Sequence, residues 1–200
     1  MPKKNKVKFG LKNVHYALAT IADDGTATFA TPVPFPGAVS MNLDAQGELT
    51  PFYADNIKYY MSNNNRGYEG DLEMARYIDQ FRKDVLGEIE DKNGVMVENA
   101  DAEAVPFALL FEFEGDVKAT RHVLYNCTAS RPATGSATTE ETKDPQTESS
   151  TISAGTILIK GLGKDGEDVN VPKASTTPDT NATAYDNWFT TVYVPEKATE

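Results

Sequence analysis

One stretch of the chain combines two residue types that serve in nucleophilic catalysis. The segment ATRHVLYNCTASRP, residues 119–132, holds Cys127, the only cysteine of the 200-residue sequence, and His122, one of two histidines. A thiolate nucleophile needs a nearby base such as imidazole. The same segment has the pattern of a strand, in which side chains five positions apart point to opposite faces. We therefore expect no dyad unless a bulge intervenes in the strand, and we expect Cys127 to be a buried residue. Its expected neighbours on one face are Val123, Tyr125 and Ala129.

Metal and nucleotide motifs are weak in this sequence. Two histidines and one cysteine cannot build a structural zinc site without carboxylates. The segment DKNG, which ends at Gly94, resembles part of a calcium loop. Counted from Gly94 as the sixth position, the first ligand position falls on Ile89 and the twelfth on Ala100, neither of which binds calcium. The glycines of KGLGKDGED do not form a phosphate-binding loop. We expect no metal and no cofactor.

Acidic residues recur at every second position in two segments. Glu112 and Glu114 share one strand face by this spacing, and so do Glu69, Asp71 and Glu73. Two carboxylates are also the catalytic pair of glycosidases. A solvated acidic row is the favoured interpretation, because 30 acidic and 19 basic residues give a formal net charge of −11. A chain this acidic does not bind a phosphate backbone by releasing counterions. We expect no enzymatic activity.

Aromatic residues gather near the end of the first third of the chain. Phe52, Tyr53, Tyr59 and Tyr60 lie within nine residues of one another. Such rings form ligand platforms, but they also fill cores and are enriched at subunit interfaces. Core or subunit contacts are the favoured interpretation. The surrounding segment DAQGELTPFYADNIKYYMSNNNR is long and lies between two strand-like runs, which predicts an arm that reaches a neighbouring molecule.

Short alternating runs separated by turn residues dominate the rest of the sequence. Val14–Ala22 reads as a strand that ends at the turn Asp23-Asp24-Gly25, and further hairpins are predicted about Asn93-Gly94 and Gly115-Asp116. The closing residues 185–195 also read as a strand. One helix is predicted over Asp79–Leu86, with Asp79 as N-cap and Gly87 just after its end. Its apolar stripe is Phe81, Val85 and Leu86.

These elements predict a mainly β fold of two packed antiparallel sheets, sandwich or barrel-like, flanked by one short α-helix. We expect a single domain over residues 1–200. It would carry a flexible N-terminal segment 1–8, a flexible acidic loop 133–150 and a flexible C-terminal end 195–200. The basic start lacks the apolar region of a secretory signal, and no run approaches the roughly 18 apolar residues of a membrane span. We expect synthesis in a cytoplasm and no membrane partner.

Six blocks of the sequence, in order, resemble a known family. They are VKFGLKNVHYA, TPFYADNIKYY, NRGYEGDLEMA, LGEIEDKNGVMVENAD, PFALLFEFEGDVKATRHVLYNCTASRP and YDNWFTTVYVP, which together run from Val7 to Pro195. The chain resembles the phi13-type major tail proteins, which are tail tube subunits of long-tailed bacteriophages of Gram-positive hosts. The segment that first suggested catalysis is among the clearest of these blocks. The segment GLGKDGEDVNVPKASTTPD, residues 161–179, has no counterpart that we can match.

This resemblance implies a structural virion protein in a phage tail, made in the bacterial host. Subunits of the family stack as rings, typically of six, into a hollow tube that conducts double-stranded DNA without binding it specifically. The implied partners are other copies of the chain, the tape-measure protein, the tail terminator and the baseplate or distal tail proteins. The ring-stacking candidates are Phe52, Tyr53, Asp55, Tyr59 and Tyr60. The lumen-facing candidates are Glu69, Asp71, Glu73, Glu112 and Glu114.

Two other functions fit the same composition. The chain could form the tube of a related contractile or injection system, or it could be a non-viral β-sandwich adhesion module. The lack of a secretory signal disfavours the adhesion module.

Overall fold

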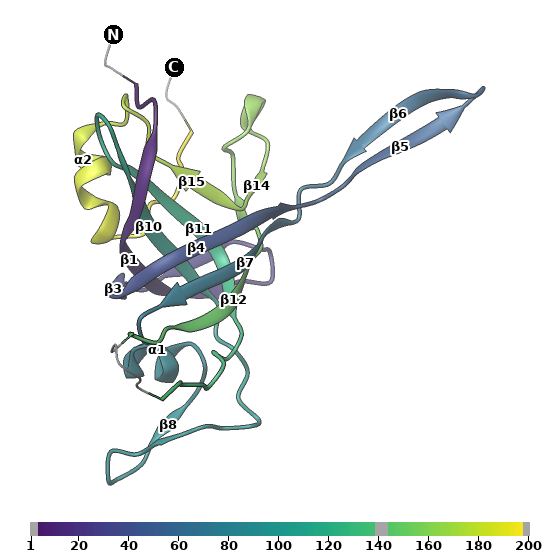
Figure 1. Cartoon of the computed structure of the whole chain (residues 1–200). Coiled ribbons are helices and arrows are strands. Elements are labelled where there is room, and N and C mark those ends of the chain that lie inside the picture. Colours follow the sequence, from purple (N-terminus) through teal and green to yellow (C-terminus); the bar gives the residue numbers. More distant parts are fainter. Residues whose placement is uncertain (1–3, 139–143, 198–200) are drawn as a thin grey trace.

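The computed structural model describes residues 4–138 and 144–197, and Figure 1 shows that the described chain is mainly β. This confirms the predicted fold class. One large antiparallel sheet has the strand order β2-β1-β10-β11-β12-β7-β4, with β3 paired to β1 and β15 paired to β11. Its strands are β1 (Lys8–Ile21), β2 (Ala27–Phe29), β3 (Val33–Pro34), β4 (Ala38–Gln46), β7 (Gly67–Met74), β10 (Phe107–Gly115), β11 (Thr120–Ala129), β12 (Glu148–Ala154) and β15 (Lys173–Ser175).

Three two-stranded ribbons extend from this sheet or cover it (Figure 1). They are β5 (Leu49–Ala54) with β6 (Ile57–Asn63), β8 (Ile89–Glu90) with β9 (Met96–Val97), and β13 (Ile157–Ile159) with β14 (Val169–Val171). The helical elements are α1 (Asp79–Asp84), α2 (Ala182–Asp186) and the 3₁₀ turns Lys164–Gly166 and Asn187–Phe189. No helix among the described residues is both long enough and apolar enough to cross a bilayer.

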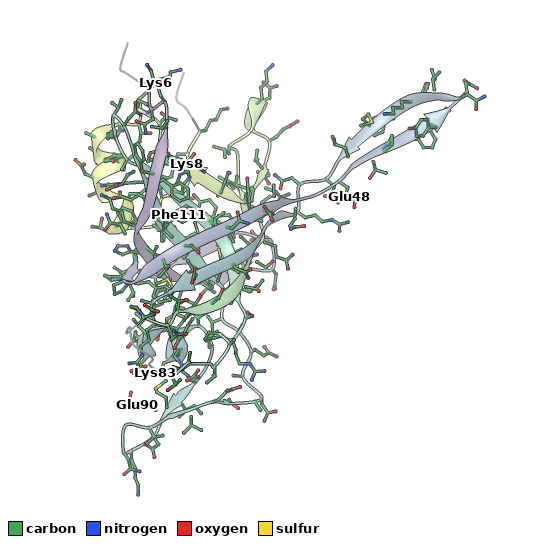
Figure 2. All side chains as sticks on the ribbon, in the orientation of Figure 1. Lys6, Lys8, Glu48, Lys83, Glu90 and Phe111 are labelled. Atoms are coloured by element: carbon green, nitrogen blue, oxygen red, sulfur yellow. The ribbon has the colours of Figure 1, made fainter. Side chains whose placement is uncertain are left out.

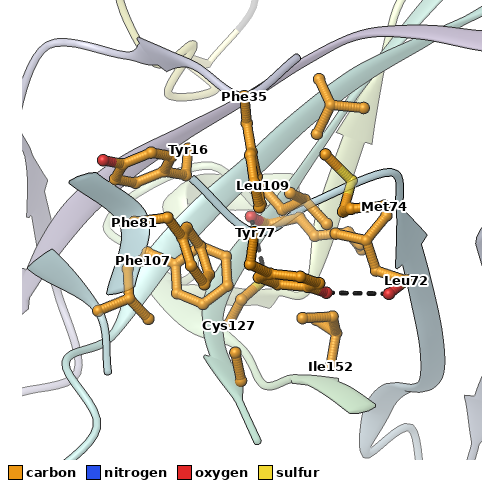
Figure 3. Packing of buried hydrophobic residues seen from close by; sticks show 14 of the residues in the cluster. Tyr16, Phe35, Leu72, Met74, Tyr77, Phe81, Phe107, Leu109, Cys127 and Ile152 are labelled. Atoms are coloured by element: carbon orange, nitrogen blue, oxygen red, sulfur yellow. Dashed lines mark hydrogen bonds between the residues drawn. The ribbon is translucent and has the colours of Figure 1, made fainter. Parts of the chain in front are cut away.

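The large sheet curves around a core that includes α1. We call the face toward this core the inner face and the opposite face the outer face. Figure 3 shows Phe81 of α1 among Tyr16 of β1, Phe107 of β10 and Phe35, which directly follows β3. The Phe35 and Phe81 rings stack with centroids 4.6 Å apart, and Tyr16 meets Phe81 edge-on at 5.0 Å. Among the described strands β4 pairs only with β7, so the sheet does not close into a barrel.

A second core lies on the outer face, over β1, β2, β10, β11 and β15, and does not extend over β12, β7 and β4. There Trp188 and Val192 of the C-terminal segment pack with Ala108, Leu110 and Tyr125 of the sheet. The outer face over β12, β7 and β4 has no such cover, as its polar side chains are exposed to solvent. The sheet therefore has one covered half and one open half on the same outer face.

The helix begins where the sequence predicts, but its cap differs. Ile78 is the N-cap and Asp79 is the first helical residue, so the prediction of Asp79 as N-cap is wrong. Its carboxylate still lies in the first turn, where the helix dipole favours negative charge. The helix ends at Asp84, two residues earlier than expected, and Gly87 follows with a φ of +70°. The predicted apolar stripe, Phe81, Val85 and Leu86, is buried as expected.

A β-bulge in β11 changes which residues share a face of the sheet with Cys127. Phe107 pairs with Cys127 and Leu109 pairs with Leu124, so β11 advances three residues while β10 advances two. Asn126 carries the irregularity with a φ of +46°, a conformation that Asn tolerates better than most residues. Cys127 thus lies in the inner core with Leu124 and Ala129, whereas Val123 and Tyr125 lie in the outer core. The expectation that His122 and Cys127 face opposite sides is wrong. The extra residue of the bulge shifts the alternation of side chains by one position, so that both residues lie on the inner face.

The C-terminal segment is helical where a strand was expected. Asn181 accepts a hydrogen bond from the backbone N–H of Ala184 at 2.8 Å and so caps α2. The Asn187–Phe189 turn follows and directs Trp188 into the outer core, where its indole N–H donates to the carbonyl of His122 at 3.2 Å. The apolar residues near Trp188 therefore alternate because they lie on helical turns, and not because the segment is a strand.

The ends of the predicted flexible segments are partly ordered. The side chain of Asn5 accepts from the backbone N–H groups of Val117 and Lys118 and so joins the N-terminal segment to the β10–β11 turn. Strand β12 begins at Glu148, inside the predicted acidic loop 133–150. Residues 1–3, 139–143 and 198–200 of the predicted flexible segments lie outside the described residues.

Candidate assembly surfaces

The pair that suggested catalysis lacks the geometry for it. His122 and Cys127 share the inner face, but five residues of strand separate them by about 15 Å. Burial raises the pKa of the Cys127 thiol to about 12, so the thiolate does not form at neutral pH. Burial, together with Lys173 and Lys8, lowers the pKa of His122 to about 4. Within residues 4–138 and 144–197, no group of three or more His, Cys, Asp or Glu side chains is placed to hold a metal ion.

The β5–β6 ribbon is a long arm that projects from the body of the molecule (Figure 1). We use the name arm for residues 47–66. Its tip is the two-residue turn Asp55-Asn56, in which both residues have positive φ, as a type I′ hairpin requires. At its root the backbone N–H of Arg66 donates to the carbonyl of Gln46 at 2.9 Å. The arm is thus a continuation of β4 and β7, joined to them by backbone hydrogen bonds.

The arm exposes apolar side chains on both of its faces. Phe52 lies opposite Tyr60 on one face, and Pro51 lies opposite Met61 on the other. Figure 2 shows side chains standing off the arm with no other part of the chain beside them. Its large apolar residues are between 45% and 70% exposed, and they are Leu49, Phe52, Tyr53, Ile57, Tyr59, Tyr60 and Met61. A two-stranded ribbon of this kind is marginal alone, and an exposed apolar surface of this size marks an interaction site.

The open half of the outer face carries the predicted acidic row of β7. Glu69, Asp71 and Glu73 lie side by side along this strand, and Leu72 and Met74 point to the inner core. Hydroxyl groups flank the row: Ser40 and Thr147 donate to the Glu73 carboxylate at 2.7 and 2.6 Å, and Thr151 donates to Asp71 at 3.0 Å. These hydrogen bonds lower the pKa of Glu73. The Glu73 carboxylate therefore stays charged under mildly acidic conditions.

Asp44 belongs to this surface and was missed from the sequence. It lies on β4 directly opposite Glu69. Like charges in directly opposite positions of a sheet are destabilising, so this pair weakens the isolated fold. The period-two run Ser40, Asn42, Asp44 was the signal that could have placed it. The three strands present no Lys or Arg at the nine outward positions Ser40, Asn42, Asp44, Glu69, Asp71, Glu73, Ser149, Thr151 and Ser153.

The other two acidic candidates lie on the covered half of the outer face. Glu112 is 3% exposed and accepts from Asn13 at 2.7 Å and from the Arg121 guanidinium at 3.1 Å. That guanidinium lies 3.8 Å from the Tyr185 ring centroid and donates to the Tyr185 carbonyl. Glu114 is exposed and forms an ion pair with Lys12. Glu112 thus anchors the C-terminal segment, and the structure does not bring it together with the β7 row.

Comparisons with known proteins point to one family. A family model described as phage tail tube protein matches residues 3–195 of the 200. No curated protein and no solved structure matches the chain. The matched range contains the arm, the β7 row and both cores.

Proposed function

The chain belongs to the phage tail tube protein family, and from this premise we propose that its copies assemble into stacked rings around a channel for DNA. Family membership supports a structural role in a phage tail and a location in the virion, and we propose that the protein is not an enzyme. We propose six copies per ring, and DNA delivery through the stacked rings as the function of the assembly. The tape-measure protein, the tail terminator and the baseplate or distal tail proteins are its proposed partners in the tail.

The observation that carries this proposal is the arm with apolar residues on both faces. A ribbon that must cover two faces needs a partner on each side, and a second copy of the chain supplies one wherever copies are stacked. At roughly 25 cal/mol per Å² of apolar surface, covering these side chains supplies a driving force for assembly. Phe52, Tyr53, Asp55, Tyr59 and Tyr60 are the proposed contacts to the next ring.

Ring closure is proposed to use the free edge of β4. This strand has nine residues, Ala38–Gln46, and its far edge has no partner strand in the described chain. Unpaired edges of this length favour pairing with another chain. Pairing of each β4 with a neighbouring copy would join the sheets into one continuous wall.

The acidic row is proposed to line the channel. Glu69, Asp71 and Glu73 face away from the core, beside the β4 edge that would join the wall. A wall of carboxylates repels phosphates, so DNA would pass without being retained. The opposed pair of Asp44 and Glu69 supports this assignment, since a surface that weakens the isolated subunit calls for another role.

Electron microscopy of the purified protein tests the proposal. At rising protein concentration we expect rings and then tubes with a central channel. A variant in which residues 49–63 are replaced by a short Gly-Asn turn keeps both cores and is expected to lose the tubes. Dispersed particles at every concentration, with or without a tape-measure protein, would contradict the proposed function.

A further inference from the structure

A cavity of about 400 Å³ opens between the two halves of the large sheet. Strands β4 and β7 supply one wall, and β1, β10, β11 and β15 supply the other. We call this cavity the mouth pocket. Its principal lining residues are Lys8, Met41, Tyr68, Phe113, His122 and Lys173. The cavity combines aromatic side chains at the rim of the inner core with two lysines, and the proposed channel does not include it.

The charge of the mouth pocket is opposite to that of the whole chain. Lys8 and Lys173 contribute two cations, and its described lining includes no Asp or Glu, in a protein of net charge −11. The Lys8 ammonium lies 5.0 Å from the Phe113 ring centroid, and the Lys173 ammonium lies 4.4 Å from that of Tyr68. Figure 2 shows Lys8 on β1 above Phe111. Both lysines also act on His122, whose low pKa reflects their positive field as well as its burial.

The arm tip has the complementary chemistry. From Leu49 to Ile57 the only charged residue is Asp55, and it sits at the turn between Tyr53 and Ile57. The turn thus presents one carboxylate with apolar side chains directly behind it. A carboxylate placed between the two ammonium groups would pair the charges of both surfaces, and the aromatic rings of the arm would cover those of the pocket.

We propose that the mouth pocket receives the arm tip of a second copy, with the Asp55 carboxylate between Lys8 and Lys173. This deepens the proposed function and rests on it, because it names the surface on the next ring that each arm contacts. The arm and the pocket are different surfaces of one chain, so the contact is heterologous. A heterologous contact that does not close on itself leaves one free arm and one free pocket at the two ends of a stack, which therefore continues to grow.

Charge exchange tests this pairing. Asp55→Lys alone and Lys8→Glu with Lys173→Glu alone should each raise the protein concentration needed for tubes by roughly tenfold or more. The triple variant should restore tubes. All three residues are exposed, so each variant should unfold at the wild-type temperature. The matched control Lys92→Glu on the β8–β9 turn should assemble as wild type.

The outcomes separate the two proposals. If wild-type protein forms tubes but the triple variant does not, the pocket is not the arm receptor, while the proposed function stands. If wild-type protein forms no tubes, the proposed function fails and this inference fails with it. Tubes from every variant would likewise overturn the pairing.

A cross-link gives a second measurement that does not require tubes. A mixture of Asp55→Cys and Lys173→Cys proteins should form a disulfide-linked heterodimer on mild oxidation. Cys127 is buried and does not compete. An equal mixture of Asp55→Cys with Lys92→Cys is the control and should stay monomeric on a denaturing gel. Equal cross-linking in the two mixtures would contradict the proposed contact.

Discussion

Burial decides the chemistry of Cys127. Its thiol lies in the inner core with its pKa raised to about 12, so we expect no role in assembly. Cys127→Ser should form tubes normally and should lose about 1 to 3 kcal/mol of unfolding free energy, because a hydroxyl replaces an apolar contact. Urea unfolding and electron microscopy measure the two effects. A variant that folds normally but forms no tubes would reopen the question of thiol chemistry.

His122 makes the stability of the fold depend on pH. Its pKa is lowered from 6.5 to about 4 by burial and by Lys173 and Lys8, so the folded state binds fewer protons than the unfolded state between these values. The unfolding free energy should therefore fall as the pH drops from 6.5 to 4, by at most about 3 kcal/mol from this group. His122→Gln should remove this part of the dependence. Parallel stability curves for the two proteins from pH 7 to pH 4 would contradict the assignment.

Glu112 and Glu114 share a strand face but should differ sharply in their contribution to stability. Glu112→Ala leaves the Arg121 guanidinium without its carboxylate in a site where the two side chains are 5% and 18% exposed, and it should cost about 3 to 5 kcal/mol. Glu114→Ala breaks only an exposed pair with Lys12 and should cost less than about 1 kcal/mol. Chemical denaturation of both variants gives the comparison. Equal losses would show that Glu112 is not an anchor.

Among the secondary-structure elements, the arm should become ordered when subunits assemble into tubes. A two-stranded ribbon without cover opens readily, so its amide hydrogens should exchange quickly in the free subunit. In tubes, residues 45–66 should become protected, while β10 should be protected in both states. Hydrogen exchange followed by mass spectrometry measures this. Equal protection of the arm in both states would show that it is an independent hairpin with no partner.

The sequence predicted those elements whose signals are local. The Asn93-Gly94 and Gly115-Asp116 hairpins and the apolar stripe of α1 depend on neighbouring residues, and the structure confirms them. The bulge at Asn126 was missed because only the pairing of β11 with β10 defines it. Helix α2 was missed because the apolar alternation around Trp188 obscured the Asn181 cap.

The candidate surfaces also differ in whether local sequence could predict them. The β7 row follows from strand alternation, and the structure places all three of its acids on one open face. The burial of Glu112 could not be predicted, since it depends on a C-terminal segment about seventy residues away along the chain. The mouth pocket is also a product of topology, because Lys8 and Lys173 come from opposite ends of the chain and line one cavity only through the pairing of β1, β10, β11 and β15.

At the scale of the whole molecule, the distribution of charge should decide how the assembly treats DNA. Tubes of the wild-type protein should not retain DNA at low salt, because the proposed channel wall is acidic. Glu69→Lys, Asp71→Lys and Glu73→Lys together should create tubes that bind DNA, with an affinity that falls steeply as salt rises. Filter binding across a salt series measures this.

A matched charge change elsewhere is the control. Asp23→Lys, Asp101→Lys and Glu103→Lys together alter the net charge equally but lie on turns and loops away from the β7 row. Equal DNA binding by the two triple variants would mean that net charge, and not the position of the row, controls retention.

The root of the arm has a mechanical consequence. Gly47 and Gly67 both have positive φ there, and a Cβ on either would meet a backbone oxygen at 1.8 or 1.9 Å, so neither position accepts a side chain. Only a narrow ribbon at this point connects the rigid body to the arm. In a stack linked by such arms, bending would concentrate at these joints while each ring keeps its shape. The stiffness of the whole filament would then be set by two glycines per subunit.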